Sequence, residues 1–334
     1  LEVLLLSSEN SSSEKLNWVE KQFRMKELGT NVKKETLAGI TTFVSMAYIL
    51  FVNPSVLGAS GMDKGAVFTA TALSAILGCL LMAFLANYPI AIAPGLGDNA
   101  FFTYSVVLAM GIKWQTALAG VVVASIIFTI LTFFKIREIV INAIPHNLKL
   151  AMAAGIGMFI AFIGLQGGGL VVASKSSLVQ LGSLTVPTTW LTIFGLFVTA
   201  LLMARKVPGS IFIGIVATAI LGLVTGLIKA PSQIVSSIPS MKPTFAVGIK
   251  HLGDVNTPQM WAVVLIFLLV AFFDTAGTLI GLAQQAGLMK NDKMPRIGQA
   301  LMADSVSMLA GSVMGTTPTA AYVESSAGIA VGAV

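Results

Sequence analysis

The chain has 334 residues, of which 56% are apolar and 10% are charged, and its mean hydropathy is +0.89. Because soluble domains carry about 25% charged residues, this composition excludes a soluble globular protein. The net charge of +6 does not indicate a nucleic-acid-binding protein, because the basic residues lie between apolar runs rather than on one face. We therefore expect a multi-pass protein of a lipid bilayer with no nucleic-acid partner.

Residues 1–30 are predicted to form a cytoplasmic tail. Residues 1–15 are rich in serine and charge, and their apolar run is too short for a signal peptide. Residues 17–28 mix Trp18 and Phe23 with basic side chains, which is typical of a helix lying on an anionic membrane surface. A solvated linker fits these residues equally well, so both interpretations stay open.

The stretches that follow are long and apolar enough, at about 20 residues each, to cross a bilayer as helices. The ten predicted spans lie near 36–57, 66–86, 89–110, 115–135, 148–166, 187–204, 208–228, 259–285, 298–315 and 316–334. With the N-terminus in the cytoplasm, alternating spans place most of the 20 Lys and Arg residues on the cytoplasmic side. Cytoplasmic loops carry such an excess, which supports both the orientation and the number of spans. The predicted fold class is an all-α polytopic membrane protein.

The third and tenth spans differ from regular membrane helices. The third begins NYPIAIAPGLGDNAFF and contains Pro94 and Gly97, and the tenth begins GTTPTAAYVESSAGIAVG and contains Pro318 and Gly328. Proline removes a backbone donor and glycine is a weak helix former, so each span is expected to be a short extended stretch followed by a half-helix. Extended backbone at membrane depth is tolerated only where protein or a cavity satisfies it, so we place the functional site at these breaks.

The spacing of the two broken spans predicts an inverted repeat. The third and the tenth are seven spans apart, and an odd offset means that equivalent elements run in opposite directions. Transporters with this arrangement bind their substrate between paired broken helices near the middle of the membrane. A seven-plus-seven design requires four further spans after Val334, so the chain is expected to be truncated after about ten spans.

Four acidic residues fall within the apolar spans, namely Asp98, Asp274, Asp304 and Glu324. An ionised side chain at the bilayer centre costs at least about 2.5 kcal/mol, so such residues usually face a cavity or a partner. No Lys or Arg falls deep in a span, so we expect none of the four acids to have an ion-pair partner in the membrane. Acids without a counter-charge tend to take up protons near neutral pH, which predicts proton coupling.

Two of these acids are predicted to bind the substrate and to couple it to protons. They are Asp274, in the middle of the eighth span, and Glu324, just after the tenth break. Asn99 lies at the matching place in the third span, and its amide can both donate and accept a hydrogen bond. We add Thr319, near Glu324, and Phe273, which could stack on a ring, although phenylalanine in a membrane helix more often faces lipid or the core.

The other two acids are expected to be structural. Asp98 stands where the third half-helix begins, and aspartate is a good N-cap. Asp304 lies in the ninth span, nearer the cytoplasmic side, where we expect a packing hydrogen bond.

The predicted site suits a nucleobase. Two half-helices would point free N–H groups and positive dipole ends at one place, where the carboxylates supply acceptors. A neutral planar molecule with both N–H donors and carbonyl acceptors matches such a site. A carboxylate that accepts from ring and exocyclic N–H groups favours guanine or hypoxanthine over adenine, which offers a bare ring nitrogen.

Four motifs in order resemble one transporter family. The strings TTFVSMAYILFVNPSVL, IAPGLGDNAFFTYSVVL, FDTAGTLIG and GTTPTAAYVESSAGIAVG resemble the AzgA-like hypoxanthine/guanine permeases of the nucleobase:cation symporter and nucleobase–ascorbate transporter group. The resemblance runs from about residue 30 to the last residue and implies two inverted seven-span repeats. It places the family's polar residue at Asn99, its carboxylate at Asp274 and its glutamate at Glu324. Asp98 is a departure, since an apolar residue is expected before that asparagine.

The resemblance also implies a division into a mobile core domain and a gate domain. After the tail at 1–30, the core would comprise residues 31–135 (spans one to four) and 259–334 (spans eight to ten). The first half of the gate would be residues 136–230, and an extracellular or periplasmic loop would follow at 231–258. The implied activity is proton-coupled purine uptake by alternating access in the cell membrane. The expected partners are a purine nucleobase, a proton and the bilayer, with a second copy in a homodimer as a further candidate.

Other functions fit parts of the sequence. An intramembrane aspartyl protease would match the GxGD pattern at 95–98. In those proteases, however, the GxGD motif follows the motif of the other catalytic aspartate, whereas here Asp274 comes after it. A channel can also contain broken helices, although two carboxylates at a paired site suit alternating access better. An anion transporter of the same fold would have its substrate repelled by Asp274 and Glu324. With one cysteine, Cys79, and two distant histidines, we expect no metal site. The transporter interpretation further predicts that the protein is not an enzyme and needs no cofactor.

Overall fold

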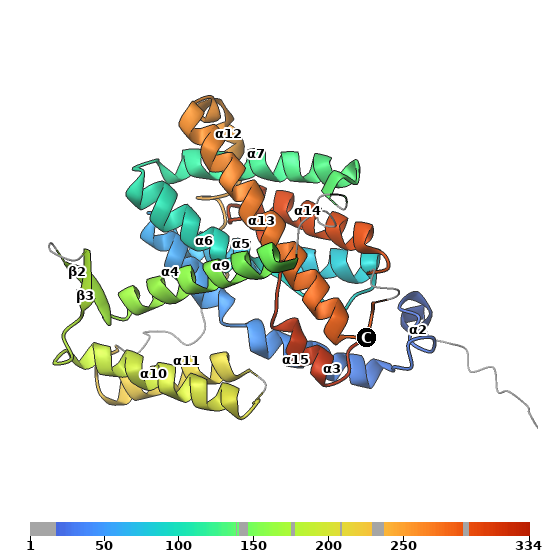
Figure 1. The fold of residues 1–334 in the computed structure, drawn as a ribbon, viewed down its shortest axis with the longest axis horizontal. Coiled ribbons are helices and arrows are strands. Elements are labelled where there is room, and N and C mark those ends of the chain that lie inside the picture. The colour runs from blue at the N-terminus through green and yellow to red at the C-terminus, as the bar shows by residue number, and fades with distance from the viewer. Residues whose placement is uncertain are drawn as a thin grey trace, which may run out of the picture.

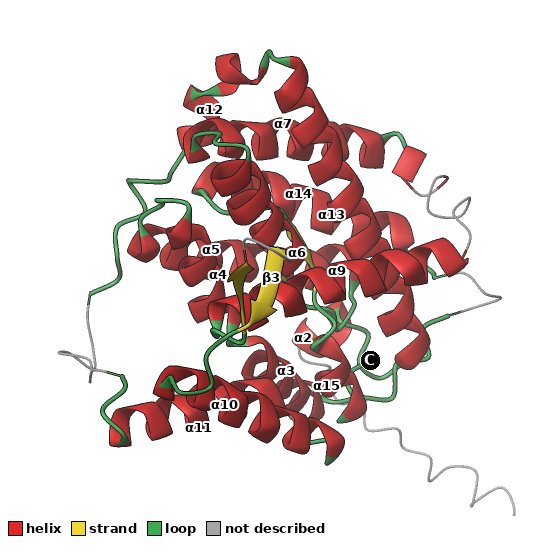
Figure 2. Ribbon diagram, turned by 60° about the vertical axis from the view of Figure 1, so that its left-hand side comes forward, coloured by secondary structure: helices red, strands yellow, loops and turns green. Residues whose placement is uncertain are grey.

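A computed structural model of the chain describes residues 18–137, 139, 146–174, 178–207, 209–228, 237–289 and 294–334. Most of these residues are helical, and the strands among them are short (Figures 1 and 2). The first part of the predicted tail, residues 1–17, and the start of the predicted loop, residues 231–236, lie outside the described residues. Several of the lysines that indicated the orientation lie outside them as well.

The elements follow one another along the chain as a succession of helices. The α-helices are α2 (Trp18–Gln22), α3 (Val32–Met46), α4 (Ile49–Ala59), α5 (Lys64–Leu81), α6 (Leu96–Ala100), α7 (Trp114–Phe133), α9 (His146–Gly167), α10 (Pro187–Ala204), α11 (Ser210–Val224), α12 (Val247–Lys250), α13 (Pro258–Gln285), α14 (Ile297–Met314) and α15 (Ser325–Ala330). Two π-helices, η1 (Met82–Ala86) and η2 (Phe101–Ala109), and a 3-10 helix, η3 (Leu252–Val255), accompany them. The strands are β1 (Ile92–Pro94), β2 (Val171–Ser174), β3 (Leu178–Leu181) and β4 (Thr319–Ala321).

Five helical stretches in the described part of the chain are long and apolar enough to cross a membrane. They are Val32–Ala59, Lys64–Ala86, Trp114–Phe133, Pro187–Ala204 and Pro258–Gln285. Each matches a predicted span, and α9, α11 and α14 occupy three more of the predicted stretches. The remaining two, the third and the tenth, are interrupted, so neither of them contains a helix long enough to cross by itself.

Local sequence signals set where the long helices begin. Asn31 caps α3 by accepting a hydrogen bond from the Lys34 backbone N–H at 2.9 Å, and Asp63 caps α5 in the same way. Thr257 caps α13, and Pro258 follows it at the first helical position, where a missing N–H is harmless.

The two interrupted segments pair with each other. Strands β1 and β4 run antiparallel, with Ala93 opposite Ala320, and both strands are buried. The contact continues past the strands, because the Gly95 N–H donates to the Pro318 carbonyl at 2.8 Å. Each strand thus satisfies the other's backbone groups, which bilayer hydrocarbon cannot do. A short helix follows each strand, α6 after β1 and α15 after β4.

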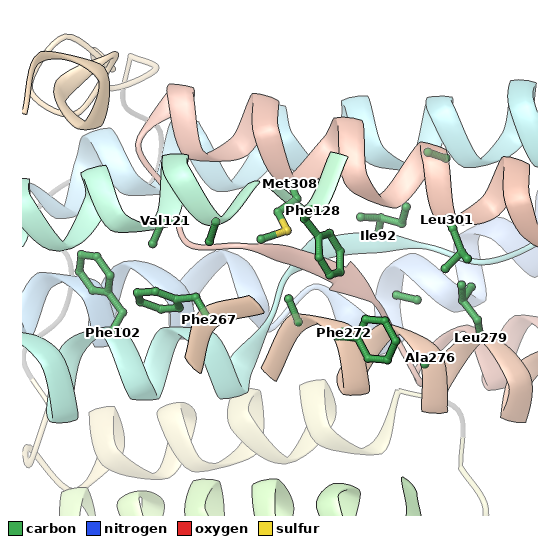
Figure 3. Packing of buried hydrophobic residues seen from close by; sticks show 14 of the residues in the cluster. Ile92, Phe102, Val121, Phe128, Phe267, Phe272, Ala276, Leu279, Leu301 and Met308 are labelled. Atoms are coloured by element: carbon green, nitrogen blue, oxygen red, sulfur yellow. The ribbon is translucent and has the colours of Figure 1, made fainter. Parts of the chain in front are cut away.

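A core of apolar side chains holds the long helices around this strand pair. Phe102, Phe128, Phe267, Leu301 and Met308 are fully or almost fully buried where η2, α7, α13 and α14 meet (Figure 3). Helices α10 and α11 pack on each other and lie apart from this bundle, close to α3 (Figures 1 and 2). The strand pair is therefore enclosed by α5, α13 and α14, which fixes its position.

Large apolar side chains also cover the outside of the helices. Phe51, Phe133, Trp190 and Phe197 are each more than half exposed. A soluble protein rarely exposes so much apolar surface, whereas lipid solvates it without cost. These surfaces are consistent with helices that face a bilayer.

One of the four intramembrane acids has a cationic partner, so the expectation that none would have one is wrong for Asp304. Arg137, just after α7, is fully buried and its guanidinium lies 2.8 Å from the Asp304 carboxylate. It also donates to the Leu301 carbonyl and to the Ser305 hydroxyl, and it lies 3.8 Å from the centroid of the Phe128 ring. The long arginine side chain reaches α14 from the edge of the span, which sequence position alone does not reveal.

Candidate functional site

A cavity of about 160 Å³ lies beside the paired strands. Its lining comes from segments far apart in the sequence: the junction of α3 and α4, the start of α6, the middle of α13, and the stretch from β4 to α15. The lining residues are Tyr48, Gly95, Leu96, Gly97, Asp274, Thr278, Ala321, Tyr322, Val323 and Glu324. The two breaks thus leave a space between helices, with a largely apolar wall, into which a few polar side chains project.

Two of the predicted site residues, Asp274 and Glu324, line this cavity together. Asp274 projects from the middle of α13, and Glu324 lies at the residue before α15. Both are partly exposed, so each has a carboxylate accessible from the cavity. The cavity therefore holds two acceptor groups on opposite segments, 50 positions apart in the sequence.

Two tyrosines complete the wall, and the sequence predictions missed both. The Tyr48 hydroxyl donates a hydrogen bond to the Glu324 carboxylate, which ties the α3–α4 junction to the start of α15. The Tyr322 hydroxyl donates to the Pro94 carbonyl at 2.5 Å and braces the strand pair. A buried tyrosine needs a partner for its hydroxyl, and Tyr48 stands within the first family motif, so that signal was available.

The other three predicted site residues lie near the breaks but are not among the residues that line the cavity. Asn99 is fully buried in α6, where its side-chain oxygen accepts from the Thr317 hydroxyl. The Thr319 hydroxyl donates to Ser307 at 3.0 Å. Phe273 packs edge-on against its neighbour in α13, with the two ring centroids 5.4 Å apart.

Asp98 does not cap the third half-helix, so that prediction is wrong. The helix α6 begins at Leu96, its N-cap residue is Gly95, and Asp98 lies inside the first turn. Both of its carboxylate oxygens are buried without a hydrogen-bond partner in the structure. The cap was misplaced because the chain turns into the helix at the glycine, earlier than the aspartate suggested.

A further buried amide joins the helices behind the cavity. Asn53 in α4 donates to the Thr71 hydroxyl at 2.7 Å and to the Thr316 hydroxyl at 2.9 Å. These bonds connect α4, α5 and the segment before β4, which helps to hold the tenth break in place. Within the residues the structure describes, no group of three His, Cys, Asp or Glu side chains is arranged to hold a metal ion.

Comparisons with known proteins agree with this architecture. Residues 33–334 match the model of a family described as "Permease family". The guanine/hypoxanthine permease PbuG of Bacillus subtilis is 53% identical over 320 residues, covering 93% of this chain and 73% of that protein. The adenine permease AdeP of Escherichia coli is 41% identical over 315 residues, covering 94% of this chain and 70% of that protein.

A solved structure shares the fold at low sequence identity. The transmembrane domain of the cyanobacterial bicarbonate transporter BicA superposes with a TM-score of 0.61 at 15% identity, covering 91% of this chain and 78% of that one. At this identity the likeness concerns the fold alone. The fold is thus that of a membrane transporter, and the match over residues 33–334 together with relatives that are permeases and not enzymes shows that the chain belongs to the permease family.

Proposed function

We propose that the protein takes up purine nucleobases, guanine or hypoxanthine above all, in symport with protons. The observation that carries this proposal is the cavity beside the strand pair, which holds the carboxylates of Asp274 and Glu324. Two carboxylates supply acceptors for the N–H groups of a neutral base, and they would repel an anion. The named substrates of relatives that are 41–53% identical, guanine, hypoxanthine and adenine, support the same substrate class.

We assign the substrate contacts to the predicted residues around this cavity. Asp274 and Glu324 would bind the base and carry the coupling proton, with Tyr48 orienting the glutamate. Asn99, Thr319 and Phe273 would act from positions just outside the cavity wall. Asn99 retains a side-chain N–H₂ group without a hydrogen-bond partner, which leaves a donor for the substrate.

The proposed mechanism is alternating access of a core domain against a gate domain. Antiparallel pairing of β1 with β4 supports an inverted repeat, because it brings the third and tenth segments together in opposite directions. The core would comprise residues 31–135 and 259–334, and the gate would begin with residues 136–230. We place the protein in the plasma or inner membrane with its N-terminus in the cytoplasm. We also propose a homodimer as its assembly.

Competition for uptake tests the substrate class. Cells that express the protein are expected to accumulate radiolabelled hypoxanthine, and unlabelled guanine should compete strongly. Adenine should compete less, because its ring nitrogen lacks the N–H group that a carboxylate accepts. Pyrimidines and oxyanions such as bicarbonate serve as controls and should not compete. Inhibition by an oxyanion with none by purines would overturn the proposed substrate.

A protonophore tests the coupling ion and the transport mode together. Dissipating the proton gradient is expected to reduce hypoxanthine accumulation to the level set by passive equilibration. The physical reason is that a symporter accumulates substrate only as far as the ion gradient drives it. Uptake that persists under a sodium gradient alone would assign the coupling to sodium. A channel would never accumulate substrate above the external concentration, with or without the protonophore.

A further inference from the structure

Asp98 is a buried acid that the proposed site does not use. It lies in α6 with no exposed surface, and neither of its carboxylate oxygens has a hydrogen-bond partner. The buried cation found in the described part of the chain, Arg137, pairs with Asp304 instead. An ionised carboxylate in such surroundings loses its hydration and gains nothing in exchange.

Asp98 faces the proposed site across a glycine. Gly95 carries no side chain, and the point where its Cβ atom would stand is 3.1 Å from an Asp98 oxygen. The same point is 3.4 Å from an oxygen of Asp274. Two carboxyl groups whose oxygens approach the same point are close enough to repel each other when both are ionised. A proton on either carboxyl group removes this repulsion.

Few other charged groups surround Asp98 in the part of the chain that the structure describes. Helix α4 carries none, and η2 carries none beyond the tyrosine at position 104. The described titratable groups on the elements around it are Asp274 on α13 and Asp304 on α14 with its partner Arg137, and Glu324 and Tyr48 line the neighbouring cavity with Asp274. Helix α9 also packs on α6, and its sequence has a histidine at position 146 and a lysine at position 149. Among the described side chains, the charged groups that act most strongly on Asp98 are the acids Asp274 and Asp304, and Asp304 is paired with its arginine.

We propose that Asp98 is the second acid of a proton site in which the carboxyl groups of Asp98 and Asp274 share one proton across Gly95. This inference rests on the proposed proton-coupled uptake and deepens it by naming a residue that sets its pH range. The neutral carboxyl of one residue donates its O–H to the carboxylate of the other, and the pair carries one negative charge. Like-charge repulsion makes such a pair hold its first proton more tightly than a single acid does.

The test is the pH profile of hypoxanthine uptake by the full-length protein in Asp98→Asn, with Asp98→Glu as the conservative variant. Wild-type uptake is expected to fall on the alkaline side, where the site loses its proton. In Asp98→Asn this fall should occur about one pH unit lower or more, because the like charge is gone and the amide stabilises ionised Asp274. Uptake near pH 5.5 should stay within about twofold of wild type, and Asp98→Glu should restore the alkaline limb in part.

The outcomes separate this inference from the function on which it rests. An unchanged alkaline limb in Asp98→Asn, with wild-type uptake still abolished by a protonophore, overturns the shared proton and leaves the proposed function intact. Wild-type uptake without any proton dependence overturns the proposed coupling itself. Asp254→Asn, which removes an exposed acid far along the chain, is the matched control and should not move the profile.

A spectroscopic measurement covers the case in which the variants do not fold. Infrared difference spectra of the purified wild-type protein should show the C=O band of a protonated carboxyl at pH 7 that disappears on raising the pH. Substrate binding should perturb this band if the pair lies beside the substrate. No protonated-carboxyl band at pH 7 would overturn the inference without any variant.

Discussion

Glu324→Gln and Asp274→Asn are each expected to lower purine uptake to background while the protein still inserts into the membrane. Each change replaces a charged acceptor in the cavity by an amide and removes a group that can carry a proton. A hydrogen bond to a charged group is worth about 1.5–3 kcal/mol, so lost binding alone corresponds to roughly 10- to 150-fold. Loss of the coupling proton would remove the remaining accumulation. The measurement is radiolabelled hypoxanthine uptake by intact cells, normalised to the amount of protein in the membrane.

Asp254→Asn is the matched control, since it removes an acid whose carboxylate is exposed, and it should transport like wild type. Glu324→Gln also changes a structural contact, because it replaces the carboxylate that accepts the Tyr48 hydrogen bond. If that bond only holds the structure, Tyr48→Phe should reduce uptake as much as Glu324→Gln does. Undiminished accumulation in both acid variants would remove Asp274 and Glu324 from the site.

Arg137→Ala is expected to produce the largest loss of stability. The substitution leaves the Asp304 carboxylate buried without a counter-charge, and breaking a buried pair in this way costs about 3–5 kcal/mol. It also removes the packing of the guanidinium on the Phe128 ring. The effect is measured as the unfolding temperature of the detergent-purified protein, with size-exclusion chromatography after heating as the detection method.

The double variant Arg137→Met with Asp304→Asn should recover much of that stability, because no unpaired charge remains and both side chains keep their approximate volume. Arg205→Ala, which removes an exposed arginine at the end of α10, should unfold at the wild-type temperature. If Arg137→Ala also unfolds at the wild-type temperature, the ion pair contributes nothing to stability. Asp304 would then have found another partner or have taken up a proton.

The class of the protein and the location of its site follow from local features of the amino-acid sequence. Composition excludes a soluble fold, because so few charges cannot cover a soluble surface. Proline and glycine act within their own turn of the chain, so Pro94 and Pro318 indicate where the backbone leaves the helix. Carboxylates in apolar runs are rare enough that Asp274 and Glu324 indicated a site by their presence alone.

The side chains that form the cavity wall do not follow from such local features. Asn99 and Thr319 stand in the correct segments, but their side chains turn into the packing between strands and helices. Tyr48 reaches Glu324 from a segment 276 residues away. Such contacts depend on how segments rotate and pair, which no local pattern encodes.

Composition and patterns within one turn of the chain are enough to predict a membrane protein, the places where its helices break and the acids in its apolar segments, because each of these is a local property. Three contacts could be found only in the folded chain: β1 pairs with β4, Arg137 neutralises Asp304, and Asp98 faces Asp274 across Gly95. A buried charge must find its partner in space, and Arg137 and Asp304 are separated by 167 positions along the chain, which no local pattern spans.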